Sequence, residues 1–147
     1  MMSLAAKRNP DFVWNEIAVI LTDDRGIVPL NQAFLAKAEV TDVISFQYEP
    51  VPGDGDLRCG DIVVNVEQAL RRGRPSRSMA KPSRELALYI AHGCDHLTGG
   101  TDDDPAGVRR MRRRELRWLR RADRDLGVCH ALMAGNRNPC MSRRRVK

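Results

Sequence analysis

The segment His92-Gly93-Cys94-Asp95-His96-Leu97-Thr98-Gly99-Gly100-Thr101-Asp102 holds two of the three histidines in this chain of 147 residues. Residues four apart on a helix project from one face about one turn apart, so His92 and His96 are spaced to bind one ion. Gly99 is suited to end that helix in a left-handed turn, after which Asp102 can return toward the histidines. The alternative is a buried helix with two incidental histidines, but the spacing favours a metal site.

Three protein ligands with one position left for water are typical of a catalytic zinc site, since structural sites are closed by four ligands. We therefore predict one zinc ion held by His92, His96 and Asp102. Zinc proteases of the H-E-x-x-H type carry a glutamate after the first histidine as general base. Gly93 occupies that position here, which disfavours a peptidase. A metal could still make a nucleophile of its water, although the pattern does not identify a general base.

This segment resembles the H-G-x-L-H-L-x-G-Y-D-H motif of the YbeY family, which are bacterial metal-dependent endoribonucleases. The matching residues are His92, Gly93, His96, Leu97 and Gly99. Two further blocks follow the family's order. Leu30-Asn31 with Thr41-Asp42-Val43-Ile44-Ser45-Phe46 resembles L-N…T-D-V-L-S-F, and Gly60-Asp61-Ile62-Val63 resembles G-D-I-x-I. The resemblance runs from about Ile17 to about Leu126, which is most of the chain.

The resemblance implies a YbeY-like metal-dependent hydrolase domain, which we place at residues 1–128. It further implies a cytoplasmic, single-strand-specific endoribonuclease that matures the 3′ end of small-subunit ribosomal RNA and serves ribosome quality control. The implied partners are ribosomal RNA and the small ribosomal subunit. No membrane partner and no small-molecule cofactor are expected.

Several positions depart from the family pattern, and Gly100-Thr101 replaces its Tyr-Asp pair. Asp102 stands where the family has its third histidine, which gives the metal a harder ligand and makes its water less acidic. Leu35 takes the place of an arginine to which the resemblance assigns a role in RNA cleavage. Two alternatives therefore stay open: a catalytically weak ribosome-assembly or RNA-binding factor that keeps the metal-binding fold, and a zinc hydrolase with another substrate, such as a peptide.

Asp95 is a further departure, because the family motif has leucine there. At about 100° per residue, Asp95 lies about 60° to one side of His92 on the helix. Its carboxylate could hold an imidazole N–H, or accept a proton from the metal's water. It could equally be an exposed aspartate without a role in the site.

Composition indicates one compact domain, because 147 residues suffice to bury a core without disulfides. The cysteines form no C-x-x-C pair and are expected to be free thiols: Cys59, Cys94, Cys129 and Cys140. Cys94 points away from the ligand face and is not counted as a ligand. With neither a signal-peptide core near Met1–Pro10 nor a run of membrane-spanning length, the sequence favours a cytosolic protein.

The order of elements favours an α+β domain, with a small mixed sheet packed against helices and the metal site on a central helix. We expect a buried strand at 17–21, ended by a turn at 23–26, with further strands at 43–48 and 62–65. Helices are expected at 29–37, with Pro29 in its first turn, from 66 to 72, from a cap at Ser83, and from Pro105 to Leu126. The last helix is expected to bury Val108, Met111, Leu119, Ala122 and Leu126.

Charge is concentrated in residues 106–147, which hold 14 Lys or Arg against 3 Asp or Glu. Such a field attracts phosphate backbones with little base preference. We predict RNA contact through Arg113, Arg117 and Arg120; the alternative is a solvated helix face. Residues 129–147 are basic, rich in Gly, Asn and Pro, and expected to be disordered when free. His130 lies in this tail and is not a predicted ligand.

Overall fold

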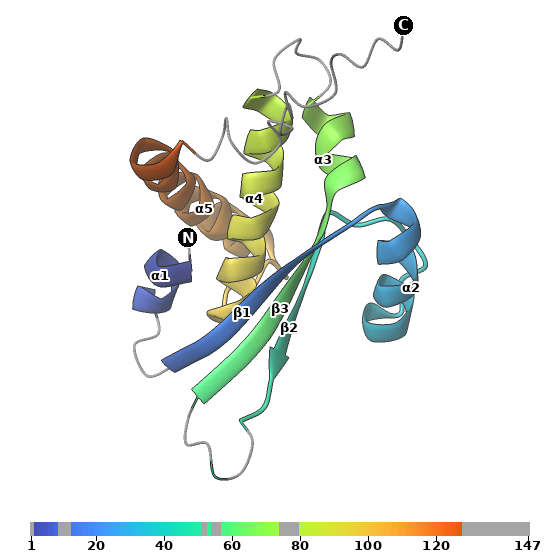
Figure 1. Ribbon diagram of the computed structural model, residues 1–147, viewed down its shortest axis with the longest axis horizontal. Coiled ribbons are helices and arrows are strands. Elements are labelled where there is room, and N and C mark those ends of the chain that lie inside the picture. Colours follow the sequence, from blue (N-terminus) through green and yellow to red (C-terminus); the bar gives the residue numbers. More distant parts are fainter. Residues whose placement is uncertain (1, 9–12, 51–52, 54–56, 74–79, 128–147) are drawn as a thin grey trace, which may run out of the picture.

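The computed structural model describes residues 2–8, 13–50, 53, 57–73 and 80–127 (Figure 1). The predicted tail at 129–147 lies outside these residues. The elements follow the order α1 (Met2–Ala5), a single 3-10 turn (Ala6–Arg8), β1 (Val13–Thr22), α2 (Asp24–Leu35), β2 (Val43–Tyr48), β3 (Leu57–Asn65), α3 (Val66–Gly73), α4 (Ala80–Leu97) and α5 (Pro105–Leu126).

The sheet is small and mixed, with strand order β1-β3-β2. β1 runs parallel to β3, whereas β2 runs antiparallel to β3, with Val43 opposite Val64. Parallel neighbours need a long crossover, and here α2 and β2 supply it. In Figure 1, α4 and α5 lie on one side of this sheet and α2 on the other. The expected α+β fold with a helix-borne histidine pair is confirmed.

The core lies between the sheet and α4. Side chains alternate along a strand, so Ile62 and Val64 of β3 share one face with Val43 of β2. Together with Leu86 and Leu97 of α4 they belong to one buried cluster. The opposite face is closed by α2, where the rings of Phe34 and Phe46 meet at 4.7 Å between centroids. The second half of the central strand β3 is buried on both faces, because Val63 is buried as well as Ile62 and Val64.

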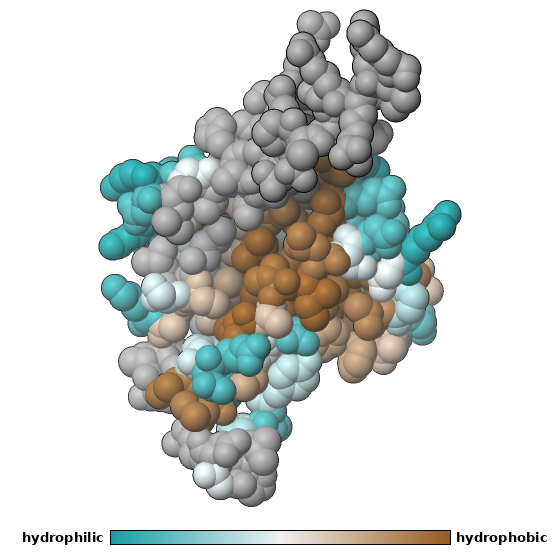
Figure 2. Space-filling model, viewed as in Figure 1, coloured by the Kyte–Doolittle hydropathy of each residue, from teal (hydrophilic) through white to brown (hydrophobic). Residues whose placement is uncertain are grey.

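The prediction that the 17–21 run is buried is wrong. β1 is an edge strand of the described sheet, and Val19, Ile20 and Leu21 are 46%, 43% and 58% exposed. Figure 2 shows hydrophobic residues gathered in the middle of this face of the molecule. A continuous apolar run indicates a strand but does not specify whether the strand is central or at an edge.

The predicted turn at 23–26 is instead the start of α2. The Asp23 carboxylate accepts a hydrogen bond from the Gly26 backbone N–H at 2.9 Å and so caps the helix. Pro29 consequently lies inside the helix rather than in its first turn. The helix ends at Leu35, two residues before the predicted end, with Ala36 in the left-handed region at φ +57°.

Helix α4 begins at Ala80, three residues before the predicted cap. Ser83 is therefore a fully buried residue within the helix and does not cap it. Leu86, Gly93 and Leu97 of this helix are buried and Ile90 is half-buried, so these residues form its core-facing stripe.

Helix α5 starts as predicted. Asp104 accepts a hydrogen bond from the Gly107 N–H, Pro105 is the first helical residue, and Gly127 closes the helix at φ +62°. Met111, Leu119 and Ala122 are buried, as expected, but Val108 is 49% exposed and the side chain of Leu126 is not described. In the described part of the chain, no helix is both long and apolar enough to cross a membrane.

Candidate metal centre

His92 and His96 lie one turn apart on α4, on the face that looks toward the start of α5. Their side chains are 25% and 34% exposed. The rings stand edge to face with centroids 4.5 Å apart, and the two Nε2 atoms are 3.1 Å from each other. The Nε2 atoms of both rings thus face one point between them.

The turn after α4 brings the third predicted ligand to that point. Gly99 adopts φ +85°, which a side chain with a Cβ reaches only at a cost. The Gly100 N–H then donates to the Asp95 carbonyl at 2.7 Å and closes the turn. Asp102 follows, with carboxylate oxygens 3.7 Å from Nε2 of His92 and 3.9 Å from Nε2 of His96. One ligand atom from each of the three residues lies within 4.8 Å of the others, so the group could hold a metal ion.

The hydrogen bonds of the two imidazoles fit a cation at this point. Nδ1 of His96 lies 3.1 Å from the Gly100 carbonyl, and Nδ1 of His92 lies 2.6 Å from a carboxylate oxygen of Glu115. Both partners only accept, so both Nδ1 atoms carry hydrogen and a neutral ring keeps a bare lone pair on Nε2. Two such lone pairs repel each other unless a proton or a metal ion lies between them. Two nitrogens on a tetrahedral zinc ion are about 3.4 Å apart, close to the separation seen here.

Glu115 of α5 is a site residue that the sequence analysis missed. Its side chain is only 4% exposed, and its second oxygen lies 3.8 Å from Nη1 of Arg112. Burial lowers the pKa of His92, but the hydrogen bond and charge of Glu115 raise it, and the net pKa lies above the ordinary value. A carboxylate on the far nitrogen fixes the tautomer of a metal-binding histidine and strengthens it as a ligand. The sequence signal was an acid on the otherwise apolar stripe of α5.

Asp95 does not occupy either of the predicted site positions, and it is not exposed. It is fully buried, and the Arg114 guanidinium donates to its carboxylate from Nε at 2.9 Å and from Nη2 at 3.0 Å. The Nδ1 atoms of His92 and His96 are bound by Glu115 and Gly100 instead. Arg114 therefore connects α5 to the helix that carries the histidines.

Gly93 is explained by packing rather than by chemistry at the metal. A Cβ built there would lie 2.6 Å from Cγ2 of Ile62 and 3.0 Å from Oγ of Ser45, so only glycine lets α4 approach the sheet. A glutamate at this position would point into the sheet. The general base of H-E-x-x-H proteases therefore has no place in this fold.

A cavity of about 400 Å³ opens beside the centre, and His92, Asp102 and Glu115 are part of its wall. The remaining wall comes from α3, α4, α5 and the residue before β2, with Asp42, Arg72, Glu85, Leu88, Tyr89, Val108, Met111 and Arg112. This volume lies within the usual range of small-ligand sites. The candidate metal site therefore opens onto a space that could admit part of a substrate.

Comparison with known proteins assigns the chain to a family. A family model described as endoribonuclease YbeY matches residues 2–123. The chain belongs to this family. A YbeY relative from Anaeromyxobacter sp. strain Fw109-5 is 41% identical over 105 residues, which cover 71% of this chain and 53% of the relative. A YbeY relative from Rhodopirellula baltica is 36% identical over 100 residues, covering 68% and 50%.

The chain thus spans about half the length of these YbeY relatives. The fold is shared with a Thermotoga maritima protein known from its solution structure. The TM-score is 0.50 at 21% identity, covering 84% of this chain and 76% of that chain.

The YbeY motif explains the turn and the histidine pair, and the structure locates the departures from it. Asp102, at the sequence position where the resemblance places a third histidine, lies beside the two imidazoles. Leu35, which the resemblance places in the register of a family arginine, ends α2 and is 54% exposed. It is not among the residues that line the cavity beside the centre. No residue of α2 is among those that line this cavity.

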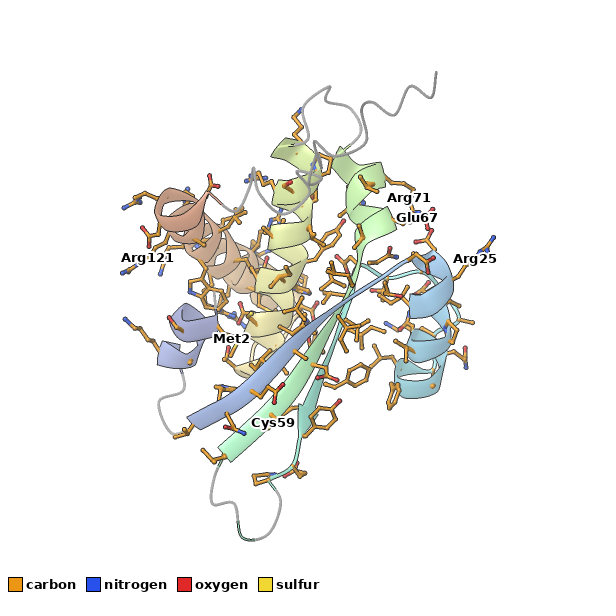
Figure 3. All side chains as sticks on the ribbon, in the orientation of Figure 1. Met2, Arg25, Cys59, Glu67, Arg71 and Arg121 are labelled. Carbon is orange, nitrogen blue, oxygen red and sulfur yellow. The ribbon has the colours of Figure 1, made fainter. Side chains whose placement is uncertain are left out.

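The arginines of α5 divide into three environments. Arg114 faces α4, and Arg112 borders the cavity. The others are exposed on the side away from the core: Arg109, Arg110, Arg113, Arg117, Arg120, Arg121 and Arg124. Figure 3 shows Arg121 projecting outward from α5. The three predicted RNA-binding residues, Arg113, Arg117 and Arg120, all belong to this outward group.

Cys94 does not join the centre, as predicted. It is 1% exposed within the core cluster, and burial raises the pKa of its thiol to about 11. Cys59 is also a free thiol, while Cys129 and Cys140 lie outside the described residues.

Proposed function

We propose that this chain is a single-strand-specific, zinc-dependent endoribonuclease of the cytoplasm that matures the 3′ end of small-subunit ribosomal RNA and serves ribosome quality control. Family membership supports the reaction class. The observation that carries the proposal is the pair of Nε2 atoms 3.1 Å apart, each held in place by a bond to Nδ1 of its own ring. Its proposed partners are ribosomal RNA and the small subunit.

His92, His96 and Asp102 would hold the ion, and a zinc ion bound there would acidify a water and polarise the scissile phosphate. Glu115 keeps the His92 ring in one tautomer, and the Gly100 carbonyl does the same for His96. Three protein ligands leave room for a water and a phosphate oxygen. A negative ligand, Asp102, makes that water less acidic than three neutral imidazoles would.

The outward face of α5 is proposed to bind the RNA backbone. Arg113, Arg117 and Arg120 follow one another at intervals of four and three residues, so they share one face of the helix. All three are exposed, and no acidic residue separates them on that face. Such a row of guanidinium groups binds phosphates without selecting bases.

The metal assignment is tested by zinc analysis together with cleavage of an RNA that contains single-stranded segments. We expect about one zinc ion per wild-type chain and metal-dependent cleavage, and neither in His96→Ala. Chelation should abolish cleavage and zinc should restore it. Equal zinc content in wild type and His96→Ala would rule out the assignment.

The RNA face is tested by reversing charge at Arg113, Arg117 and Arg120. The triple glutamate variant should bind unrelated RNAs more weakly and with a flatter salt dependence. A matched control places glutamate at the exposed residues Arg25, Lys37 and Lys81, which changes the net charge equally. If both triple variants lose affinity alike, α5 contributes only to the net charge.

A second candidate is a ribosome-assembly or RNA-binding factor that retains the fold and the metal with little catalysis. Leu35 in place of the family's arginine favours it. Under this alternative, wild type would contain zinc and bind RNA, yet cleave no faster than His96→Ala. A peptide hydrolase is disfavoured, since Gly93 is packed against the sheet.

A further inference from the structure

Two arginines from different helices line the cavity that contains His92 and Asp102. Arg112 comes from α5 and Arg72 from α3, some 40 residues earlier in the chain. All other charged residues in this wall are acidic, namely Asp42, Glu85, Asp102 and Glu115. The two guanidinium groups are thus the cationic positions of an otherwise acidic cavity.

Arg112 lies beside the candidate metal centre. Its Nη1 is 3.8 Å from the Glu115 oxygen that does not bind His92, and its side chain is 50% exposed. One oxygen of Glu115 therefore serves the histidine while the other faces Arg112. Because Arg112 keeps half of its surface open, its remaining N–H groups can reach a phosphate that binds at the metal.

Arg72 lies farther along the same cavity. Burial raises the pKa of Tyr89, and the positive charge of Arg72 opposes that rise, so the two side chains lie near each other. Tyr89 precedes His92 by three residues on α4, a rise of about 4.5 Å along the helix axis. Arg72 is exposed, and among the described residues no carboxylate lies within ion-pair distance of it. Its neighbour Arg71, in contrast, binds Asp24 in two hydrogen bonds and points toward α2 (Figure 3). Arg71 thus stabilises the fold, whereas the guanidinium of Arg72 can bind a ligand in the cavity.

We infer that Arg112 and Arg72 bind successive phosphates of the RNA strand, Arg112 at the phosphate beside the metal centre and Arg72 at a flanking one. The inference rests on the proposed function. Guanidinium groups suit phosphates because their fork of N–H donors can bind two oxygens at once. The acidic residues Asp42 and Glu85 repel phosphate from the rest of the wall, so the strand is confined to the line between the two arginines.

The test uses the full-length, zinc-loaded protein and two readouts. Binding is measured by fluorescence anisotropy at several salt concentrations, with a short single-stranded 2′-O-methyl oligoribonucleotide that resists cleavage. Cleavage of the matching RNA gives kcat and KM. The variants are Arg72→Gln and Arg112→Gln, and the matched control is Arg25→Gln, an exposed arginine that points outward from α2 (Figure 3).

Arg72→Gln should weaken binding about tenfold and reduce the salt slope by about 0.7, with kcat unchanged. Arg112→Gln should lower kcat about 100-fold, since its contact strengthens in the transition state. Its zinc content should equal that of wild type, which separates phosphate binding from support of Glu115.

If wild type binds and cleaves RNA but both variants behave like Arg25→Gln, the inference is wrong and the proposed function stands. Loss of zinc in Arg112→Gln would assign that residue to the metal centre and overturn its proposed role. If wild type neither binds nor cleaves RNA, the proposed function itself fails.

Discussion

Replacing Arg114 with leucine removes the guanidinium that neutralises Asp95, a carboxylate with no exposed surface. Removing one partner of a buried ion pair costs about 3–5 kcal/mol, because the other charge stays buried. Asp95→Leu should cost less, since Arg114 is 24% exposed and can turn toward water. The double variant Asp95→Leu with Arg114→Leu replaces the pair with apolar groups and should lie within about 1 kcal/mol of wild type, or above it.

The four proteins of this cycle are compared by urea unfolding with circular dichroism, in the presence of a chelator so that metal binding does not contribute. Arg113→Leu is the matched control, because this neighbour faces solvent and should change stability by less than about 0.5 kcal/mol. A double variant destabilised by the sum of the two single changes would refute the reasoning.

Glu115→Gln keeps an acceptor for the His92 N–H but removes the charge, so zinc affinity should fall about tenfold with the fold intact; unchanged affinity in a chelator competition would contradict the role of Glu115. Gly99→Ala introduces a Cβ at φ +85° and should cost about 1 kcal/mol in urea unfolding, whereas unchanged stability would mean that the turn relaxes. The hydrogen bond from Arg71, and then that from Asn65, hold the pKa of Asp24 below its ordinary 3.8. The resulting stability is present above that ordinary value and is lost as pH falls through the lowered pKa, so Asp24→Asn should flatten the acid limb of the stability curve.

The parts of the fold that depend on local pattern were predictable. The spacing of His92, His96 and Gly99 predicts the helix, its end and the position of Asp102. All of these features depend on residues within one or two helical turns of each other. The start of α5 is equally local, since Asp104 and Pro105 act on the first turn. The β1 and β3 runs were recognised as strands for the same reason.

What failed depends on contacts between distant segments. Glu115 is 23 residues from His92, and only the crossing of α5 over α4 brings them together. The same crossing pairs Arg114 with Asp95, so a helix that looks uniformly basic in sequence contains one residue that is half-buried in an ion pair. The prediction for the burial of β1 was wrong because strand order depends on how all the strands pair. The apolar run at 17–21 does not specify its place in the sheet.

The two imidazoles differ in how easily a mutation can remove the hydrogen-bond partner of Nδ1. His92 depends on a side chain, so a single codon change at Glu115 removes its partner. His96 depends on the backbone carbonyl of Gly100, which no codon change deletes. A library of random variants should therefore contain defective centres altered at position 115, whereas His96 should lose its partner only through residues that set the path of the turn, such as Gly99. The orientation of His92 therefore depends on the identity of one side chain, whereas that of His96 depends on the conformation of the main chain.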